Sequence, residues 1–207
     1  MTFGIARPRG IRRRVVFQLI AALGFWFAVQ AGELRAVAPW TLERLVTELA
    51  AHSEGCARFS ETRFVKVLTT PLKSSGTLRY RRPDYLEKHI LSPKNEILRV
   101  EGDRVTIEDG TPDSPRSLNL GDLPQVQAII ESIRAPLIGN LEVLNRLFQV
   151  SLGGSERRWL LALTPREARF GELLRAVYVR GTGDRITRID IEERNGDRSE
   201  MTIEPLR

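Results

Sequence analysis

Apolar and polar residues alternate along several short segments of the chain, which is typical of β-strands with one buried face. The alternating segments cover residues 57–68, 76–82, 85–91, 96–100, 104–108, 158–163, 173–180, 186–193 and 199–203. Short turns separate neighbouring segments, and the run Asn195-Gly196-Asp197 is a strong hairpin signal. The pattern therefore predicts antiparallel strands joined as a meander.

Apolar residues recur at helical spacing in three other segments. Residues 41–52 begin with Thr41, whose hydroxyl is suited to cap a helix. A second helix opens at Asp122, and we expect Pro136 to break it because proline lacks the backbone N–H that a helix needs. A third helix is expected over residues 140–148.

The order of elements is one helix, about five strands, two short helices and about four strands. Helices inserted into a meander must bury their apolar sides, and the concave face of a strongly curved sheet can receive them. We therefore expect an α+β fold that is mainly β. It would be a curved antiparallel sheet, or half-open barrel, with helices plugging its concave face.

The N-terminal residues have the composition of a secretory signal peptide. Residues 1–31 carry five arginines and no acidic residue, and an apolar run of fifteen residues covers 15–29. This run is shorter than the roughly 20 residues of a membrane-spanning helix. We expect cleavage after Ala31, or alternatively after Ala38, and export to the periplasm. An uncleaved N-terminal anchor is the other interpretation.

Charge argues against a nucleic-acid partner. The formal net charge is +6, but without residues 1–31 the chain has 27 basic and 26 acidic residues. Residues 32–207, which we expect to form a single domain, therefore have no strong field to attract phosphates.

The residue types that carry most enzyme chemistry are sparse. His52 and His89 are the only histidines, and Cys56 is the only cysteine, so no intrachain disulfide forms. No metal-binding motif and no nucleophile with an orienting base appears in the sequence. We therefore expect no catalytic residue, no metal, no cofactor and no enzyme activity. Two carboxylates that meet across the sheet are the remaining arrangement that could carry out catalysis.

Several short motifs occur in a characteristic order. Phe59 is followed by G-T-L at 76–78, R-P at 82–83 with Y-L after it, and P-x-x-x-I-L at 93–98. Later, L-x-L-x-P covers 161–165. Over residues 40–205 the chain resembles the periplasmic outer-membrane lipoprotein carrier family (LolA-like), as a divergent branch. Family members are half-open antiparallel barrels plugged by helices. One departure is Lys88, which stands where the family commonly has tryptophan.

The resemblance implies a carrier that shields acyl chains in an apolar cavity and delivers a lipoprotein or another lipid towards the outer membrane. It would act as a monomer between an inner-membrane donor and an outer-membrane acceptor. Fourteen apolar residues are candidates for the cavity lining, with ordinary core as the alternative interpretation. They are Leu78, Tyr80, Leu86, Ile90, Leu98, Val100, Val105, Ile107, Ile129, Ile130, Ile133, Leu137, Leu141 and Leu144.

The resemblance also gives a role to the arginine of the R-P motif. In the family this arginine hydrogen-bonds the helical plug, and by position it is Arg82. We expect Arg82 to latch the helices of residues 122–148, because a guanidinium suits the free carbonyls at a helix end. A surface arginine screened by Asp84 is the plainer interpretation.

Two further functional classes stay open. The same fold can serve as a periplasmic lipid-sensing or scaffold module that binds a membrane protein, and an enzyme on this fold is the third class. The cargo itself is open between a lipoprotein, a glycolipid and a polyketide-like lipid.

Overall fold

The computed structural model describes residues 39–171 and 173–206, which belong to one unit, Pro39–Arg207. The expected signal peptide of residues 1–31 and the alternative cleavage after Ala38 lie outside the described residues.

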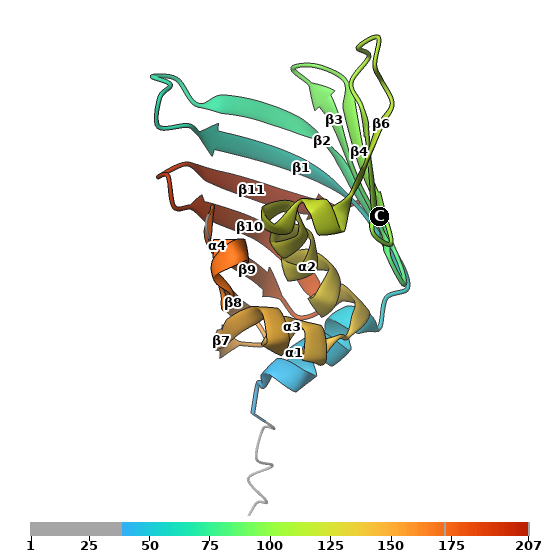
Figure 1. Ribbon diagram of the computed structural model, residues 1–207. Helices are drawn as coiled ribbons and strands as arrows, with labels where there is room; N and C mark the ends of the chain where they lie inside the picture. The colour runs from blue at the N-terminus through green and yellow to red at the C-terminus, as the bar shows by residue number, and fades with distance from the viewer. Residues whose placement is uncertain (1–38, 172, 207) are drawn as a thin grey trace, which may run out of the picture. The chain divides into compact units, whose positions relative to one another are not determined.

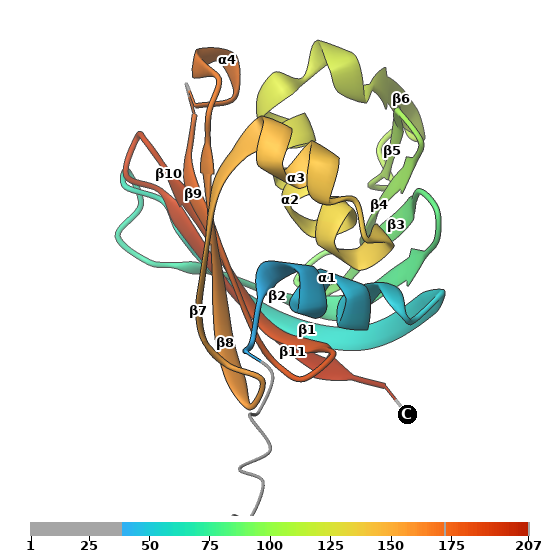
Figure 2. The ribbon, with the colours of Figure 1, turned by 90° about the horizontal axis from the view of Figure 1, so that it is seen from below.

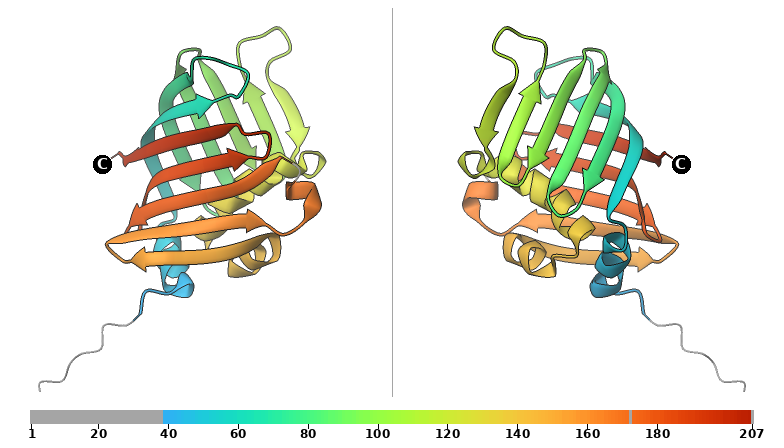
Figure 3. Two further views of the ribbon diagram at one scale, coloured as in Figure 1. Left: turned by 90° about the vertical axis from the view of Figure 1, so that its left-hand side faces the viewer. Right: turned by 90° about the vertical axis from the view of Figure 1, so that its right-hand side faces the viewer.

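The described residues form one antiparallel sheet of eleven strands, which is curved and does not close (Figure 1). The strands in chain order are β1 (Glu54–Phe64), β2 (Leu72–Arg81), β3 (Tyr85–Ser92), β4 (Glu96–Glu101), β5 (Arg104–Glu108), β6 (Arg116–Asn119), β7 (Phe148–Ser155), β8 (Arg158–Pro165), β9 (Leu174–Thr182), β10 (Arg185–Glu193) and β11 (Arg198–Pro205). Their order in the sheet is β6-β5-β4-β3-β2-β1-β11-β10-β9-β8-β7. The first and last strands of the unit therefore join two meanders at its centre, as Figure 3 shows.

The helices are α1 (Leu42–Ala50), the 3-10 helix η1 (Leu120–Asp122), α2 (Pro124–Ile138), α3 (Leu141–Leu147) and α4 (Ala168–Gly171). The segment with η1, α2 and α3 connects β6 to β7, which are the two edges of the sheet. It must therefore cross from one edge to the other. Figure 2 shows α1, α2 and α3 inside the curve of the sheet, so the predicted mainly β fold with helices on the concave face is confirmed.

Helix α1 forms where the sequence predicts it, although it ends at Ala50 and not at residue 52. The Thr41 hydroxyl accepts a hydrogen bond from the Arg44 backbone N–H at 3.3 Å, which is an N-cap. Leu45, Val46 and Leu49 lie on one side of the helix and are buried against the sheet and the other helices. The capping hydroxyl and the apolar side together specify this helix.

The expectation that Pro136 breaks the second helix is wrong. Helix α2 continues through Pro136 to Ile138 and ends at Gly139, whose φ of 82° is the left-handed conformation that favours glycine. The missing N–H of Pro136 falls in the last turn, where a single lost bond interrupts little of the helix. Pro136 is also buried, and this packing offsets the loss.

Two strands were not predicted. Strand β6 consists of exposed residues and carries no alternating pattern that could reveal it. Strand β7 begins at Phe148, which the sequence pattern assigned to the preceding helix. Strand β1 also begins at Glu54 rather than at residue 57, and it ends at Phe64. The second meander therefore has five strands instead of four.

Candidate functional site

The apolar concave face is the predicted cargo site, and strand register decides which side chains share it. Residues that are paired across neighbouring antiparallel strands point to the same face. Leu78 is paired with Lys88 of β3, and Lys88 with Leu98 of β4. The same register places all eight predicted strand residues on one face: Leu78, Tyr80, Leu86, Ile90, Leu98, Val100, Val105 and Ile107.

This face meets the helices in two apolar clusters. The larger cluster includes the predicted residues Leu78, Ile90, Ile129, Ile133, Leu141 and Leu144. The smaller cluster includes Leu86, Leu98, Val100, Val105, Ile107 and Ile130. Tyr80 and Leu137 are half-buried and belong to neither cluster. Twelve of the fourteen predicted residues therefore pack in these clusters, while their role as a cavity lining and their contact with lipid stay predictions.

Burial within the site is uneven. Val100, Val105 and Leu144 are buried, whereas Leu78 and Leu98 are half-buried, so solvent reaches part of the apolar face. Two hollows in the described part of the chain have other linings, at Arg58, Ser60 and Thr77 and around Arg188 and Asp190, respectively. These residues alternate along their strands with residues of the concave face, so they lie on the outer face. These two hollows therefore lie on the outer face of the sheet and not over the predicted cargo residues.

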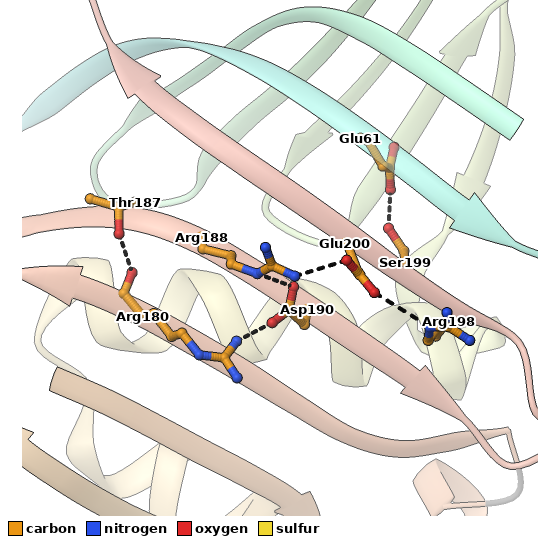
Figure 4. A network of polar contacts seen from close by, with 8 residues as sticks. All are labelled: Glu61, Arg180, Thr187, Arg188, Asp190, Arg198, Ser199 and Glu200. Atoms are coloured by element: carbon orange, nitrogen blue, oxygen red, sulfur yellow. Dashed lines mark hydrogen bonds and ion pairs between the residues drawn. The ribbon is translucent and has the colours of Figure 1, made fainter. Parts of the chain in front are cut away.

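A pair of opposite charges lies on the concave face, and sequence reasoning did not find it. The Lys88 ammonium donates to Oε2 of Glu61 at 2.5 Å, and it lies 5.0 Å from the centre of the Phe59 ring. The Ser74 hydroxyl donates to the same oxygen at 3.2 Å, and the Ser199 hydroxyl donates to Oε1. Figure 4 shows the contact between Glu61 of β1 and Ser199 of β11.

The surroundings of Glu61 keep its carboxylate ionised. Burial raises the pKa of Glu61, but the Lys88 charge and the hydrogen bonds from Lys88, Ser199 and Ser74 outweigh burial and lower the pKa below its usual 4.5. A lowered pKa stabilises the fold above the usual value, and this contribution is lost as the pH falls through the lowered pKa.

The variant Glu61→Gln should consequently lose about 2 kcal/mol of unfolding free energy at neutral pH, because Lys88 loses its charged partner. The difference from the wild type should shrink as the pH falls below 4.5. Urea unfolding over a pH series measures it. Glu204→Gln, at an exposed position of β11, is the control. A difference that does not change with pH contradicts the assignment.

Arg82 follows β2 directly and lies beside the C-terminal ends of two helices. Its Nη1 donates to the carbonyl of Ala50 in α1 at 2.6 Å, and its Nη2 to the carbonyl of Ile138 in α2 at 3.4 Å. Neither helix has a basic residue in its last turn, so this guanidinium supplies the positive charge that a helix C-terminus favours. Within the described residues Arg82 forms no ion pair with Asp84. The contact reaches the predicted helix, and its role as a latch stays a proposal.

Arg134 of α2 makes a second contact between helix and sheet that was not predicted. Its Nη1 donates to the carbonyl of Gly102, in the turn between β4 and β5, at 2.7 Å. The guanidinium also pairs with Glu131 on the same helix, and the two side chains are only 12% and 10% exposed. The one signal in the sequence was an acidic and a basic residue three positions apart on a helix without other charged residues.

The outer face of the sheet is polar where β9, β10 and β11 meet, as Figure 4 shows. Arg188 donates to Asp190 at 2.7 Å and to Glu200 at 2.9 Å. Arg180 pairs with Asp190, and Arg198 with Glu200. Such partly exposed pairs contribute little to stability individually. Their location shows that the outer face is polar over these three strands.

Among the described residues, no group of three or more histidine, cysteine, aspartate or glutamate side chains is arranged to hold a metal ion. No helix in the described part of the chain has the length and apolar character needed to cross a membrane.

Comparison with known proteins gives one family and several weakly similar solved structures. The model of the family described as "Outer membrane lipoprotein carrier protein LolA-like" matches residues 31–203. No curated protein sequence matches the chain significantly.

Three of the solved structures that match the chain are the following. A LolA superfamily protein of Nitrosomonas europaea (NE2245) is 12% identical, with a TM-score of 0.46 over 80% of this chain and 91% of that chain. An outer membrane lipoprotein-sorting protein domain of Vibrio parahaemolyticus is 8% identical, with a TM-score of 0.43 over 78% and 88%. A chain of the Pseudomonas aeruginosa MucA/MucB complex is 14% identical, with a TM-score of 0.41 over 78% and 53%.

Proposed function

The chain belongs to the LolA-like family of outer membrane lipoprotein carrier proteins, and on this premise we propose that it is a periplasmic carrier and not an enzyme. It shields the acyl chains of a lipoprotein or another lipid and delivers them towards the outer membrane. The observation that supports this proposal most directly is an apolar concave face covered by helices that polar contacts hold in place.

The physical need for such a carrier is large. Each methylene group that leaves water gains about 0.8 kcal/mol, so one long acyl chain exposes on the order of 10 kcal/mol of apolar surface in an aqueous compartment. The sheet offers a surface of matching character once the helices move aside. An inner-membrane donor loads the carrier, and an outer-membrane acceptor takes the cargo from it.

Helix movement is the step that exchanges core contacts for cargo contacts. Ile129 and Ile133 of α2 pack on the larger cluster in the closed state. Acyl chains in the same place would restore the apolar contacts that these side chains give up, so the exchange costs little hydrophobic free energy. The polar contacts of Arg82 and Arg134 then decide how readily the closed state returns.

Native mass spectrometry of the protein purified from the periplasm, followed by organic extraction, tests this proposal. We expect a bound acylated species and the uptake of an added fluorescent fatty acid. Transfer of that cargo to acceptor membranes separates a carrier from a lipid-sensing module. A cargo-free mass without uptake would contradict the proposal and favour the scaffold function.

Two matched variants separate the concave from the outer face in the same assay. Leu98 and Ile97 are neighbours in β4, both half-buried, and they point to opposite faces. Leu98→Gln should weaken fatty-acid uptake about fivefold, because a polar amide would face the acyl chain. Ile97→Gln should leave the uptake unchanged. Equal effects of the two variants would place the lipid elsewhere.

A further inference from the structure

Lys88 occupies a central position on the apolar face. Leu78 and Leu98 flank it on the neighbouring strands, and Leu86 and Ile90 flank it along β3. All four are predicted cavity residues and are half-buried. Lys88 is itself 24% exposed, so its side chain is accessible within the same surface. A charge in such a place is costly unless it is paired and hydrogen-bonded.

The two partners of the ion pair differ in their free hydrogen-bonding capacity. The Glu61 carboxylate already accepts from Lys88, Ser74 and Ser199. An ammonium has three donors, and within the described part of the chain Lys88 uses one of them, towards Glu61. Glu61 is also the less exposed partner, at 13%. The free hydrogen-bonding group that this pair offers to a ligand is therefore a donor, the ammonium of Lys88.

The charge balance of the pair determines which acceptor fits. Glu61 and Lys88 together are neutral, and the strand neighbours of Lys88 on this face are apolar. A phosphate or a free carboxylate bound there would leave one uncompensated negative charge in a poorly hydrated place, which is unfavourable. A neutral carbonyl oxygen would receive a charge-assisted hydrogen bond and leave the balance unchanged.

We propose that Lys88, held by Glu61, is a recognition site for the ester carbonyl of an acylated cargo. The proposal rests on the carrier function proposed above and defines its substrate class, ester-linked acyl chains. The acyl chains would lie on the surrounding leucine and isoleucine side chains while the carbonyl oxygen accepts from Nζ of Lys88. Glu61, fixed by the two serine hydroxyls, is a positioning residue that orients the ammonium.

Two lipids that differ only in this carbonyl test the proposal. A diacylglycerol and the dialkylglycerol ether of the same chain lengths would each displace a bound fluorescent fatty acid from the purified full-length protein. The wild type should bind the diacylglycerol about tenfold more tightly, as expected for one hydrogen bond to a charged group. A free fatty acid of the same chain length should compete less well than its methyl ester.

The double variant Glu61→Met/Lys88→Met removes both charges and leaves no unpaired partner, so it should fold. It should bind the ester and ether lipids equally, while Lys73→Met, at an exposed lysine of β2, keeps the tenfold preference. Equal binding of both lipids by the wild type would overturn the ester site and leave the carrier function standing. A preference that persists in the double variant would also overturn it. Binding of neither lipid, with no fatty-acid uptake, would overturn the carrier function itself.

Discussion

The variant Arg82→Leu is expected to hold cargo about thirtyfold more tightly than the wild type and to transfer it correspondingly more slowly. The guanidinium joins β2 to the ends of α1 and α2 through the carbonyls of Ala50 and Ile138. These two bonds favour the closed state by about 2 kcal/mol, after allowance for the exposure of Arg82. Cargo competes with that closed state, so its affinity rises when closure weakens.

The transfer assay can separate this effect from a general loss of structure. Fluorescent fatty acid bound to the protein would be mixed with acceptor vesicles, and both its affinity and its transfer rate would be measured. Arg81→Leu is the matched control, because Arg81 is also exposed at the end of β2 but stacks on Tyr85 at 5.0 Å. Arg82→Lys keeps the charge without the planar fork and should fall between wild type and Arg82→Leu. Normal transfer by Arg82→Leu would exclude the latch.

Arg82 and Arg134 both hold α2 in place, but their contacts differ in exposure to solvent. Arg82 contacts the exposed C-terminal end of the helix, while Arg134 contacts the Gly102 carbonyl from a largely buried position. A bond at an exposed end breaks and forms easily because water replaces it. Removing Arg134 instead leaves Glu131 buried without its partner. Arg82 is therefore the better candidate for a contact that opens in each transfer cycle.

The sequence predicts the face of each strand well because alternation has a period of two and needs no tertiary knowledge. Leu98 and Val100, for example, lie two residues apart in one strand, so they point to the same face whatever the pairing register. The ion pair of Glu61 and Lys88 could not be predicted in this way. Strand β2 lies between β1 and β3, so the contact depends on the curvature of the sheet and on the reach of the lysine side chain.

Element ends were less predictable for reasons that particular residues show. Phe148 continues the apolar side of α3 and also begins the alternation of β7, so the pattern fits both elements. Pro136 has a low helix propensity that its buried packing and the nearby end at Gly139 override. The contact of Arg134 is a different case, because it does not concern the end of an element: no local pattern connects this residue with a turn 32 residues earlier.

Replacing Gly76 by alanine should destabilise the protein by about 3 kcal/mol, although the change adds one methyl group. A Cβ built on Gly76 would lie 1.9 Å from the His89 carbonyl oxygen and 3.0 Å from the Ile90 Cα atom, both backbone atoms of β3. The strands would have to separate at the place where the register between β2 and β3 already shifts. Their separation would also disturb the face that carries Leu78.

This clash gives a physical reason for the glycine in the G-T-L motif, and urea unfolding can measure its cost. Gly153 in β7 is the matched control, because a Cβ there meets no atom within 4 Å. Gly153→Ala should change the unfolding free energy by less than about 0.5 kcal/mol. An equally small effect of Gly76→Ala would mean that β3 can shift without loss of packing. It would contradict the conclusion that the close approach of β2 and β3 requires glycine at this position.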